Sequence, residues 1–242
     1  QSHVAISFQL PVYTSTVGTI GTLNILESIK FFNLKKIKFY NAASSEMYGN
    51  SKQRKQGENT NFLPNSPYAS SKLYSYWITK NYRESYKIFA TNGILFNHES
   101  EFRGNTFVTR KISLFVAKYS NTKKGILYLG NINSKRDWGY APEYVKAMWL
   151  MLQEKKPDDF VVGTGKIYSV KEFTKKAFEV VDLKYEKFTK TNRALHRPSE
   201  VELLCADITK INKRLKWKSK VTFEELVEKM VKNDYDLIRK KI

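Results

Sequence analysis

Four side chains that can hold or move protons occur in two nearby segments of the sequence. Ser44 and Glu46 follow a mostly apolar run, and Tyr68 and Lys72 lie four residues apart farther along the chain. A positioned carboxylate or phenol can act as a general base, and a nearby cation favours the ionised form of a phenol. If the fold brings the two segments together, a hydroxyl, a carboxylate, a phenol and an ammonium meet around one small space.

A strand end and a helix start would have to position these groups. Residues 37–43 have the character of a buried parallel strand that delivers polar residues at its carboxyl end. Ser66 is a good helix N-cap and Pro67 suits the first helical turn. Tyr68 and Lys72 would then share one helix face. Tyr-x-x-x-Lys recurs elsewhere in this chain, so from spacing alone an ordinary amphipathic face is an equally good interpretation.

The alternation of strands and helices predicts an α/β fold with a doubly wound parallel sheet. Residues 17–32 carry apolar side chains at helical spacing, and residues 89–97 form a second buried run that ends in polar residues. The other expected elements are a strand or strand-to-helix junction at 3–9, helices at 66–87, 107–119, 142–154, 169–181, 207–215 and 222–240, strands at 126–129, 159–163 and 202–205, a polar-aromatic turn at 135–140 and a basic loop at 184–197.

Composition narrows the class of protein. The 242 residues are 41% hydrophobic, with 15 Phe and 15 Tyr, which is enough for a core. We expect no transmembrane helix, signal peptide or metal site. The single cysteine, Cys205, fits a reducing compartment such as the cytoplasm. The net charge of +19 comes mostly from scattered Lys, so a solvated basic surface is favoured over nucleic-acid binding.

Longer motifs carry a resemblance to a known family. They include F-Y-N-A-A-S-S-E-M-Y-G, N-S-P-Y-A-S-S-K, N-G-I-L-F-N-H-E-S, F-V-T-R-K-I-S and K-R-D-W-G-Y-A. Over nearly its whole length the chain resembles the GDP-mannose 4,6-dehydratases, which are extended short-chain dehydrogenases/reductases. The resemblance implies conversion of GDP-mannose to GDP-4-keto-6-deoxymannose, the precursor of GDP-fucose, with NADP that is needed but not consumed. It also implies a cytoplasmic homo-oligomer, either a dimer or a tetramer.

The resemblance assigns roles to individual residues. Tyr68, favoured as phenolate by Lys72 and by the cofactor's positive ring, would take the C4 hydroxyl proton. Glu46 would remove the C5 proton and assist loss of the C6 hydroxyl, and Ser44, where the family usually has Thr, would hydrogen-bond the C4 oxygen. The residues that correspond to NADP contacts are Gln1, Ser2, Tyr13, Lys72, His98 and Arg103, and those that correspond to GDP-mannose contacts are Asn97, Lys111, Arg136, Arg197 and Glu200.

The family's strand–G-x-x-G-x-x-G–helix motif, which holds a pyrophosphate at a helix N-terminus, does not occur in this sequence. We therefore expect an incomplete Rossmann-like sheet: residues 1–98 as the C-terminal part of an NADP-binding domain, and residues 99–242 mainly as a smaller α/β domain for the GDP-sugar, with segments near 126–163 returning to the sheet. We also expect the chain alone to bind NADP poorly and to be inactive.

Three other functions stay open at this point. One is a related nucleotide-sugar epimerase or reductase, although simple epimerases lack a carboxylate at the position of Glu46. A second is a non-catalytic pseudo-subunit that pairs with an intact partner, which the absent glycine motif favours. The third is a polyanion-binding protein, for which binding would weaken steeply with salt.

Overall fold

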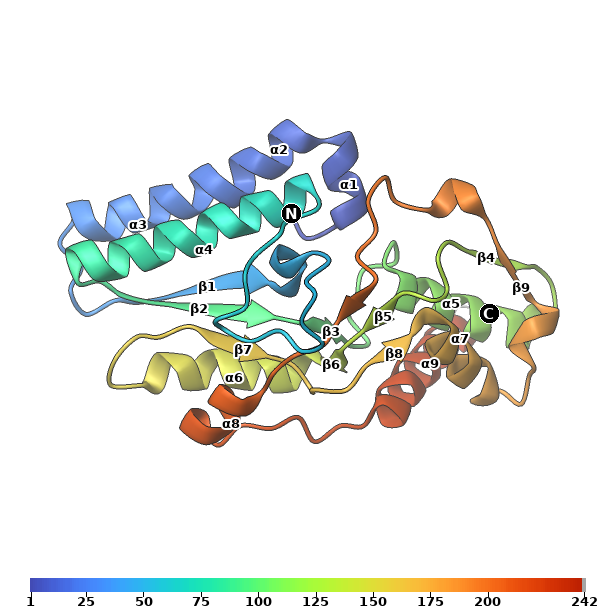
Figure 1. The fold of residues 1–242 in the computed structure, drawn as a ribbon. Coiled ribbons are helices and arrows are strands. Elements are labelled where there is room, and N and C mark those ends of the chain that lie inside the picture. Colours follow the sequence, from blue (N-terminus) through green and yellow to red (C-terminus); the bar gives the residue numbers. More distant parts are fainter. Residues whose placement is uncertain (241–242) are drawn as a thin grey trace.

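The computed structural model describes residues 1–240, apart from the side chain of Asn121, and Figure 1 shows how its elements are arranged. The α-helices are α1 (Val4–Gln9), α2 (Pro11–Ser15), α3 (Gly21–Phe31), α4 (Pro67–Tyr86), α5 (Val108–Thr122), α6 (Ala141–Gln153), α7 (Val170–Glu179), α8 (Thr209–Leu215) and α9 (Phe223–Arg239). The strands are β1 (Lys38–Ser44), β2 (Phe89–Leu95), β3 (Asn97–Glu99), β4 (Leu127–Leu129), β5 (Lys135–Arg136), β6 (Trp138–Tyr140), β7 (Phe160–Val162), β8 (Tyr168–Ser169), β9 (Thr189–Thr191) and β10 (Leu203–Leu204). Short turns of other helix types are η1 (Thr16–Ile20), η2 (Ser45–Tyr48), η3 (Tyr185–Lys187) and η4 (Arg193–Leu195).

A parallel sheet in the order β1-β2-β7 supports the site. β1 pairs with β2 in parallel from Lys38 opposite Phe89 to Ser44 opposite Leu95, so both strands end at the same edge. Helices α3 and α4 lie on one face of this sheet and α6 lies on the other (Figure 1). The predicted α/β class with a parallel sheet is therefore confirmed.

Local capping chemistry fixes the start of α4. The Ser66 side chain accepts a hydrogen bond from the Ala69 N–H at 3.0 Å, and Pro67 occupies the first turn, where its missing N–H is no loss. The helix ends at Lys87, which adopts left-handed backbone geometry. The helix predicted at 66–87 is confirmed, and its cap places Tyr68 in the first turn.

The first thirty residues are almost entirely helical, so the strand alternative at 3–9 is wrong. The His3 ring caps α1 by accepting the Ile6 N–H at 3.4 Å. Serine and threonine hydroxyls of this segment bond carbonyls one turn back, as Thr14 does with Leu10 at 2.8 Å, which satisfies these polar groups inside a helix. Gly18 has a packing role, because a Cβ there would lie 2.6 Å from Oγ of Ser71 on α4.

Strands β5 and β6 stand where the sequence predicted a turn at 135–140. Their partners come from far along the chain: β5 pairs with β10 and β8, and β6 pairs in parallel with β3. The region predicted as a basic loop at 184–197 likewise contains β9, which pairs in parallel with β4. Strands of two or three residues are too short to show an alternating pattern, so only the distant partners reveal them.

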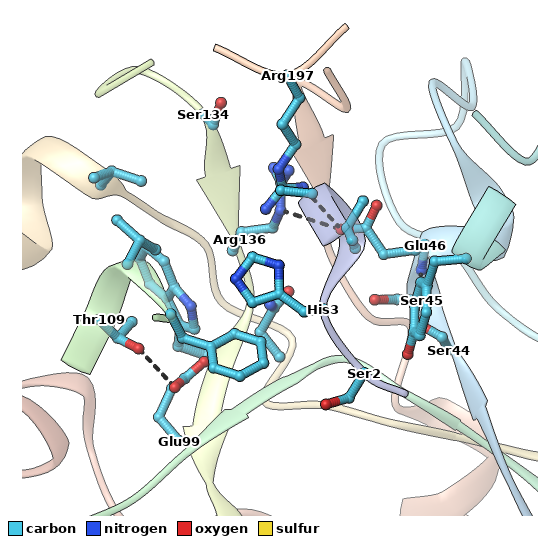
Figure 2. Close-up of a pocket in the computed structure, with 18 of the residues that line it drawn as sticks. Ser2, His3, Ser44, Ser45, Glu46, Glu99, Thr109, Ser134, Arg136 and Arg197 are labelled. Atoms are coloured by element: carbon cyan, nitrogen blue, oxygen red, sulfur yellow. Dashed lines mark hydrogen bonds and ion pairs between the residues drawn. The ribbon is translucent and has the colours of Figure 1, made fainter. Parts of the chain in front are cut away.

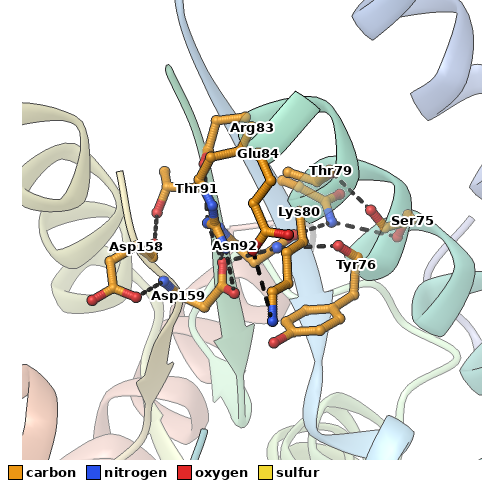
Figure 3. A network of polar contacts seen from close by, with 12 residues as sticks. Ser75, Tyr76, Thr79, Lys80, Arg83, Glu84, Thr91, Asn92, Asp158 and Asp159 are labelled. Carbon is orange, nitrogen blue, oxygen red and sulfur yellow. Dashed lines mark hydrogen bonds and ion pairs between the residues drawn. The ribbon is translucent and has the colours of Figure 1, made fainter. Parts of the chain in front are cut away.

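A buried polar network joins α4 to strands β2 and β7 (Figure 3). Arg83 donates two hydrogen bonds to the Asp159 carboxylate, at 2.7 and 2.9 Å. The Asn92 amide donates to the same carboxylate at 2.9 Å. Burial opposes ionisation of Asp159, but the bonds from Arg83 and Asn92 outweigh it and lower the pKa of the carboxyl. The network thereby locks the helix that carries Tyr68 onto the sheet.

Candidate active site

A cavity of about 470 Å³ lies where β1 and β2 end. Figure 2 shows side chains from both halves of the chain around it. Most residues predicted as site residues line it, namely Ser2, Ser44, Glu46, Tyr68, Lys72, Asn97, His98, Arg103, Lys111, Arg136, Arg197 and Glu200.

Two residues predicted as cofactor contacts are not among the residues that line this cavity. The Gln1 amide bonds the His3 carbonyl at 2.8 Å. Tyr13 lies on α2, where 55% of it is exposed. Tyr13 therefore projects from an exposed part of helix α2, outside the cavity.

Short contacts tie the end of β1 to the cavity side of α4. The Ser44 hydroxyl accepts the Glu46 N–H at 3.2 Å and caps η2, which fixes the backbone that carries the carboxylate. From the neighbouring helix, Lys72 Nζ donates to the Ala42 carbonyl at 2.9 Å. The four groups that the two motifs predicted to converge, including Tyr68, do line one cavity.

Burial dominates the ionisation of the phenol. It raises the pKa of Tyr68, the Glu46 charge adds to this effect, and a hydrogen bond with Ser44 opposes it. Burial also lowers the pKa of Lys72. Lys72 Nζ lies 5.9 Å from the centre of the Tyr68 ring, over its face. Without a bound cofactor, burial is thus the largest influence on the pKa of the phenol, and the ionisation expected from Lys72 together with the cofactor's positive ring stays a prediction.

Two guanidinium groups flank the Glu46 carboxylate. Arg136 Nε and Arg197 Nη1 each lie 3.9 Å from Glu46 Oε1 (Figure 2). Arg136 is buried, and burial lowers its pKa while the nearby Glu46 opposes that shift. The Arg197 N–H donates to Glu200 Oε1 at 3.0 Å, which braces the segment on which Arg197 sits. A planar guanidinium suits an anion with several oxygens, such as a phosphate.

A buried carboxylate that sequence reasoning did not single out lies on the β3 side of the cavity. Glu99 accepts a hydrogen bond from Thr109 at 2.7 Å and pairs with Arg103 Nε at 3.0 Å. Burial raises the pKa of Glu99, and the Arg103 charge opposes the rise. The Arg103 guanidinium in turn lies 3.5 Å from the centre of the Phe107 ring. Glu99 directly follows His98 at the end of a predicted strand, and this position is the sequence signal that could have identified it.

His98 is held from two sides. Its Nδ1 lies 2.8 Å from the Phe96 carbonyl oxygen, and its ring stacks on Tyr144 with centres 5.0 Å apart. Burial is the main cause that lowers the pKa of His98. The ring can therefore present a fixed, neutral edge to the cavity.

Charge at the cavity favours an anionic ligand. Five cationic side chains line it against three carboxylates; the cations are Lys72, Arg103, Lys111, Arg136 and Arg197, and the carboxylates are Glu46, Glu99 and Glu200. Among residues 1–240, no cluster of His, Cys, Asp and Glu is suited to hold a metal ion. In the same range, no helix is both long and apolar enough to cross a membrane.

Comparison with known proteins identifies relatives. A family model described as GDP-mannose 4,6 dehydratase matches residues 1–230. The GDP-mannose 4,6 dehydratase of Dictyostelium discoideum is 48% identical over 99% of this chain, which spans 72% of that protein. The enzyme of the same name from Drosophila melanogaster is 46% identical over 99% of this chain, which spans 65% of it. Among solved structures, RMD from Pseudomonas aeruginosa complexed with NADPH matches with a TM-score of 0.86 and 17% identity over 98% of this chain and 79% of that one.

Proposed function

The chain belongs to the GDP-mannose 4,6-dehydratase family, and we propose that it supplies the catalytic and substrate-binding part of an enzyme that dehydrates GDP-mannose to GDP-4-keto-6-deoxymannose. The observation that carries this proposal is the convergence of Ser44, Glu46, Tyr68 and Lys72 on one cavity. A carboxylate beside a phenol and a hydroxyl supplies a base for C5 as well as one for the C4 hydroxyl. An enzyme that only oxidises and reduces C4 has no use for that carboxylate.

Tyr68 is placed to accept the proton of the C4 hydroxyl, and the Ser44 hydroxyl is placed to hydrogen-bond the C4 oxygen. A bound nicotinamide cofactor would supply the hydride chemistry of the reaction, as acceptor for the hydride of C4 and donor of a hydride to C6. Glu46 removes the C5 proton, which the C4 ketone acidifies, and passes it to the departing C6 hydroxyl, which leaves as water; a proton returns to C5 when C6 receives the hydride. The buried phenol needs cationic neighbours to ionise near neutral pH, and Lys72 lies over its ring.

The nucleotide's diphosphate fits between Arg136 and Arg197, whose guanidinium groups both face the cavity. Lys111 and Asn97 line the same cavity and can donate to further oxygens, and the Glu200 carboxylate can accept from a hydroxyl or a guanine edge. The cavity thus offers donors to the phosphates and acceptors to the sugar or base.

The residues present also fit the nicotinamide ribose of such a cofactor. An ammonium has three N–H donors, and the Lys72 ammonium uses one on the Ala42 carbonyl, which leaves donors for ribose hydroxyls. We propose NADP as the cofactor because the resemblance to the family implies it; solved structures of the same fold hold NADPH or NAD. Ser2, His98 and Arg103 line the cavity and are proposed contacts. A homo-oligomeric state, a cytoplasmic location and the division near residue 98 stay predictions.

Product analysis tests the proposal. The whole protein that contains this sequence, and not the 242-residue chain alone, is incubated with GDP-mannose and NADP, and the sugar product is identified by mass spectrometry and NMR. We expect loss of one water and a 4-keto-6-deoxy product, with no net change in NADP. A C4 epimer of GDP-mannose, or stoichiometric consumption of the cofactor, would contradict the proposal and favour an epimerase or a reductase.

A further inference from the structure

One hydroxyl at the cavity has no partner. Ser134 is 7% exposed and lines the cavity, and within residues 1–240 its Oγ makes no hydrogen bond. Buried side-chain hydroxyls in folded proteins are almost always paired, so an unpaired one calls for an explanation. Sequence analysis did not single out this residue.

The backbone fixes the direction of this side chain. Ser134 immediately precedes β5, and Ser134, Arg136 and Trp138 line the cavity while Lys135 between them is exposed. This alternation is typical of a strand, and it places Ser134 and Arg136 on one face, about 7 Å apart along the chain. Figure 2 shows both side chains at the cavity.

Backbone hydrogen bonds hold Ser134 and Lys135 in place, whereas the Ser134 hydroxyl is free to rotate. The Ser134 carbonyl accepts the Val170 N–H at 3.2 Å, and the Lys135 N–H donates to the Glu202 carbonyl at 2.8 Å. Because its Oγ makes no bond, Ser134 can turn between staggered rotamers without breaking one. The structure therefore offers a free donor on a fixed support, next to a guanidinium group.

We propose that Ser134 is a substrate-binding residue whose hydroxyl donates to an oxygen in the nucleotide half of the nucleotide sugar, beside the group that Arg136 holds. This inference rests on the proposed function, because it assumes that the cavity takes a nucleoside diphosphate sugar. The nucleotide half is favoured over the sugar because Ser134 shares its strand face with a guanidinium that suits a diphosphate.

Binding of GDP and of GDP-mannose, measured by calorimetry, tests the assignment in Ser134→Ala. We expect both dissociation constants to rise about five- to twentyfold, the usual range for one lost hydrogen bond to a charged or polar group. The melting temperature without ligand should not fall, because the hydroxyl that is removed has no partner to lose. Thr189→Val is the matched control: its hydroxyl is also buried and unbonded but does not line the cavity, so both affinities should stay unchanged.

Each other outcome overturns a definite statement. Unchanged affinities in Ser134→Ala would remove its role in binding, and a loss for GDP-mannose alone would contradict the nucleotide half. If Ser134→Ala melts at a lower temperature and Thr189→Val loses as much affinity for GDP and GDP-mannose, the role of Ser134 is structural only. If the parent protein binds neither GDP nor GDP-mannose, the proposed function itself fails, whatever the variants do.

Discussion

Glu46 Oε1 lies 3.9 Å from Arg136 Nε, a separation at which the two charges attract each other without a hydrogen bond. Arg197 Nη1 approaches the same oxygen at 3.9 Å. The proposed base of the reaction thus sits between the two groups proposed to hold the diphosphate. Neither contact is a hydrogen bond, so a phosphate can bind the two guanidinium groups without breaking a hydrogen bond to Glu46, which stays available to accept a proton.

Removal of one of these cations should weaken nucleotide binding. In Arg197→Gln we expect the dissociation constant for GDP to rise at least tenfold, because a charge-assisted hydrogen bond to a phosphate is lost. Calorimetry with GDP gives the value directly. Arg193→Gln removes an exposed arginine of the same segment that does not line the cavity, and it should leave affinity unchanged. Equal losses in both variants would show only a general effect of charge.

The Ser44 hydroxyl should set the pH at which the phenol becomes a base. Its hydrogen bond lowers the pKa of Tyr68 against the larger opposite effect of burial. In Ser44→Ala that bond is gone, so the rising limb of kcat/KM with pH should move to higher pH. Tyr68→Phe should reduce kcat by a factor on the order of 100 or more and abolish the limb. The exposed Ser70→Ala serves as a control, and an unmoved limb in Ser44→Ala would contradict the assignment.

The Arg83–Asp159 pair should be a major source of stability. Asp159→Asn leaves the Arg83 charge buried without its partner, so we expect a loss of about 3 kcal/mol or more in the free energy of unfolding at pH 7. The neighbouring Asp158→Asn should cost about 1 kcal/mol or less, because its bonds to Lys210 and Arg214 are partly exposed. Urea unfolding measures both, and similar losses would contradict the account.

The same pair predicts a dependence of stability on pH. The pKa of Asp159 is lowered in the folded state, so its contribution is complete above the unfolded value of about 4. It is lost as pH falls below that value and the carboxyl is protonated. The difference in unfolding free energy between the parent protein and Asp159→Asn should therefore shrink below pH 4. A difference that is constant with pH would show that Asp159 acts through packing alone.

Local signals explain why part of this structure was predictable. Ser66 and Pro67 lie at the start of the helix that they delimit, so its beginning could be predicted from the sequence. The convergence of Glu46 and Tyr68 followed from the rule that parallel strands present polar residues at their carboxyl ends. Each of these inferences needed only short-range chemistry or one general rule of sheet architecture.

What could not be predicted depends on distant partners or on burial. Strand β5 forms because β10, nearly seventy residues later, pairs with it, and no sequence pattern near Lys135 predicts that pairing. The raised pKa of Tyr68 is a balance between burial and nearby groups, which spacing does not reveal. The unpaired hydroxyl of Ser134 is visible only once every buried donor has been assigned a partner.

The most direct test of the central claim is the product made by Glu46→Gln. This variant keeps the size of the side chain but removes the base for C5, so C4 oxidation should persist while 4-keto-6-deoxy product falls by a factor on the order of 100 to 10,000. Nicotinamide absorbance reports oxidation, and mass spectrometry reports loss of water; the exposed Glu186→Gln is the matched control. Deoxy product formed at the parent's rate would contradict the claim that Glu46 completes a dehydratase site with Ser44 and Tyr68.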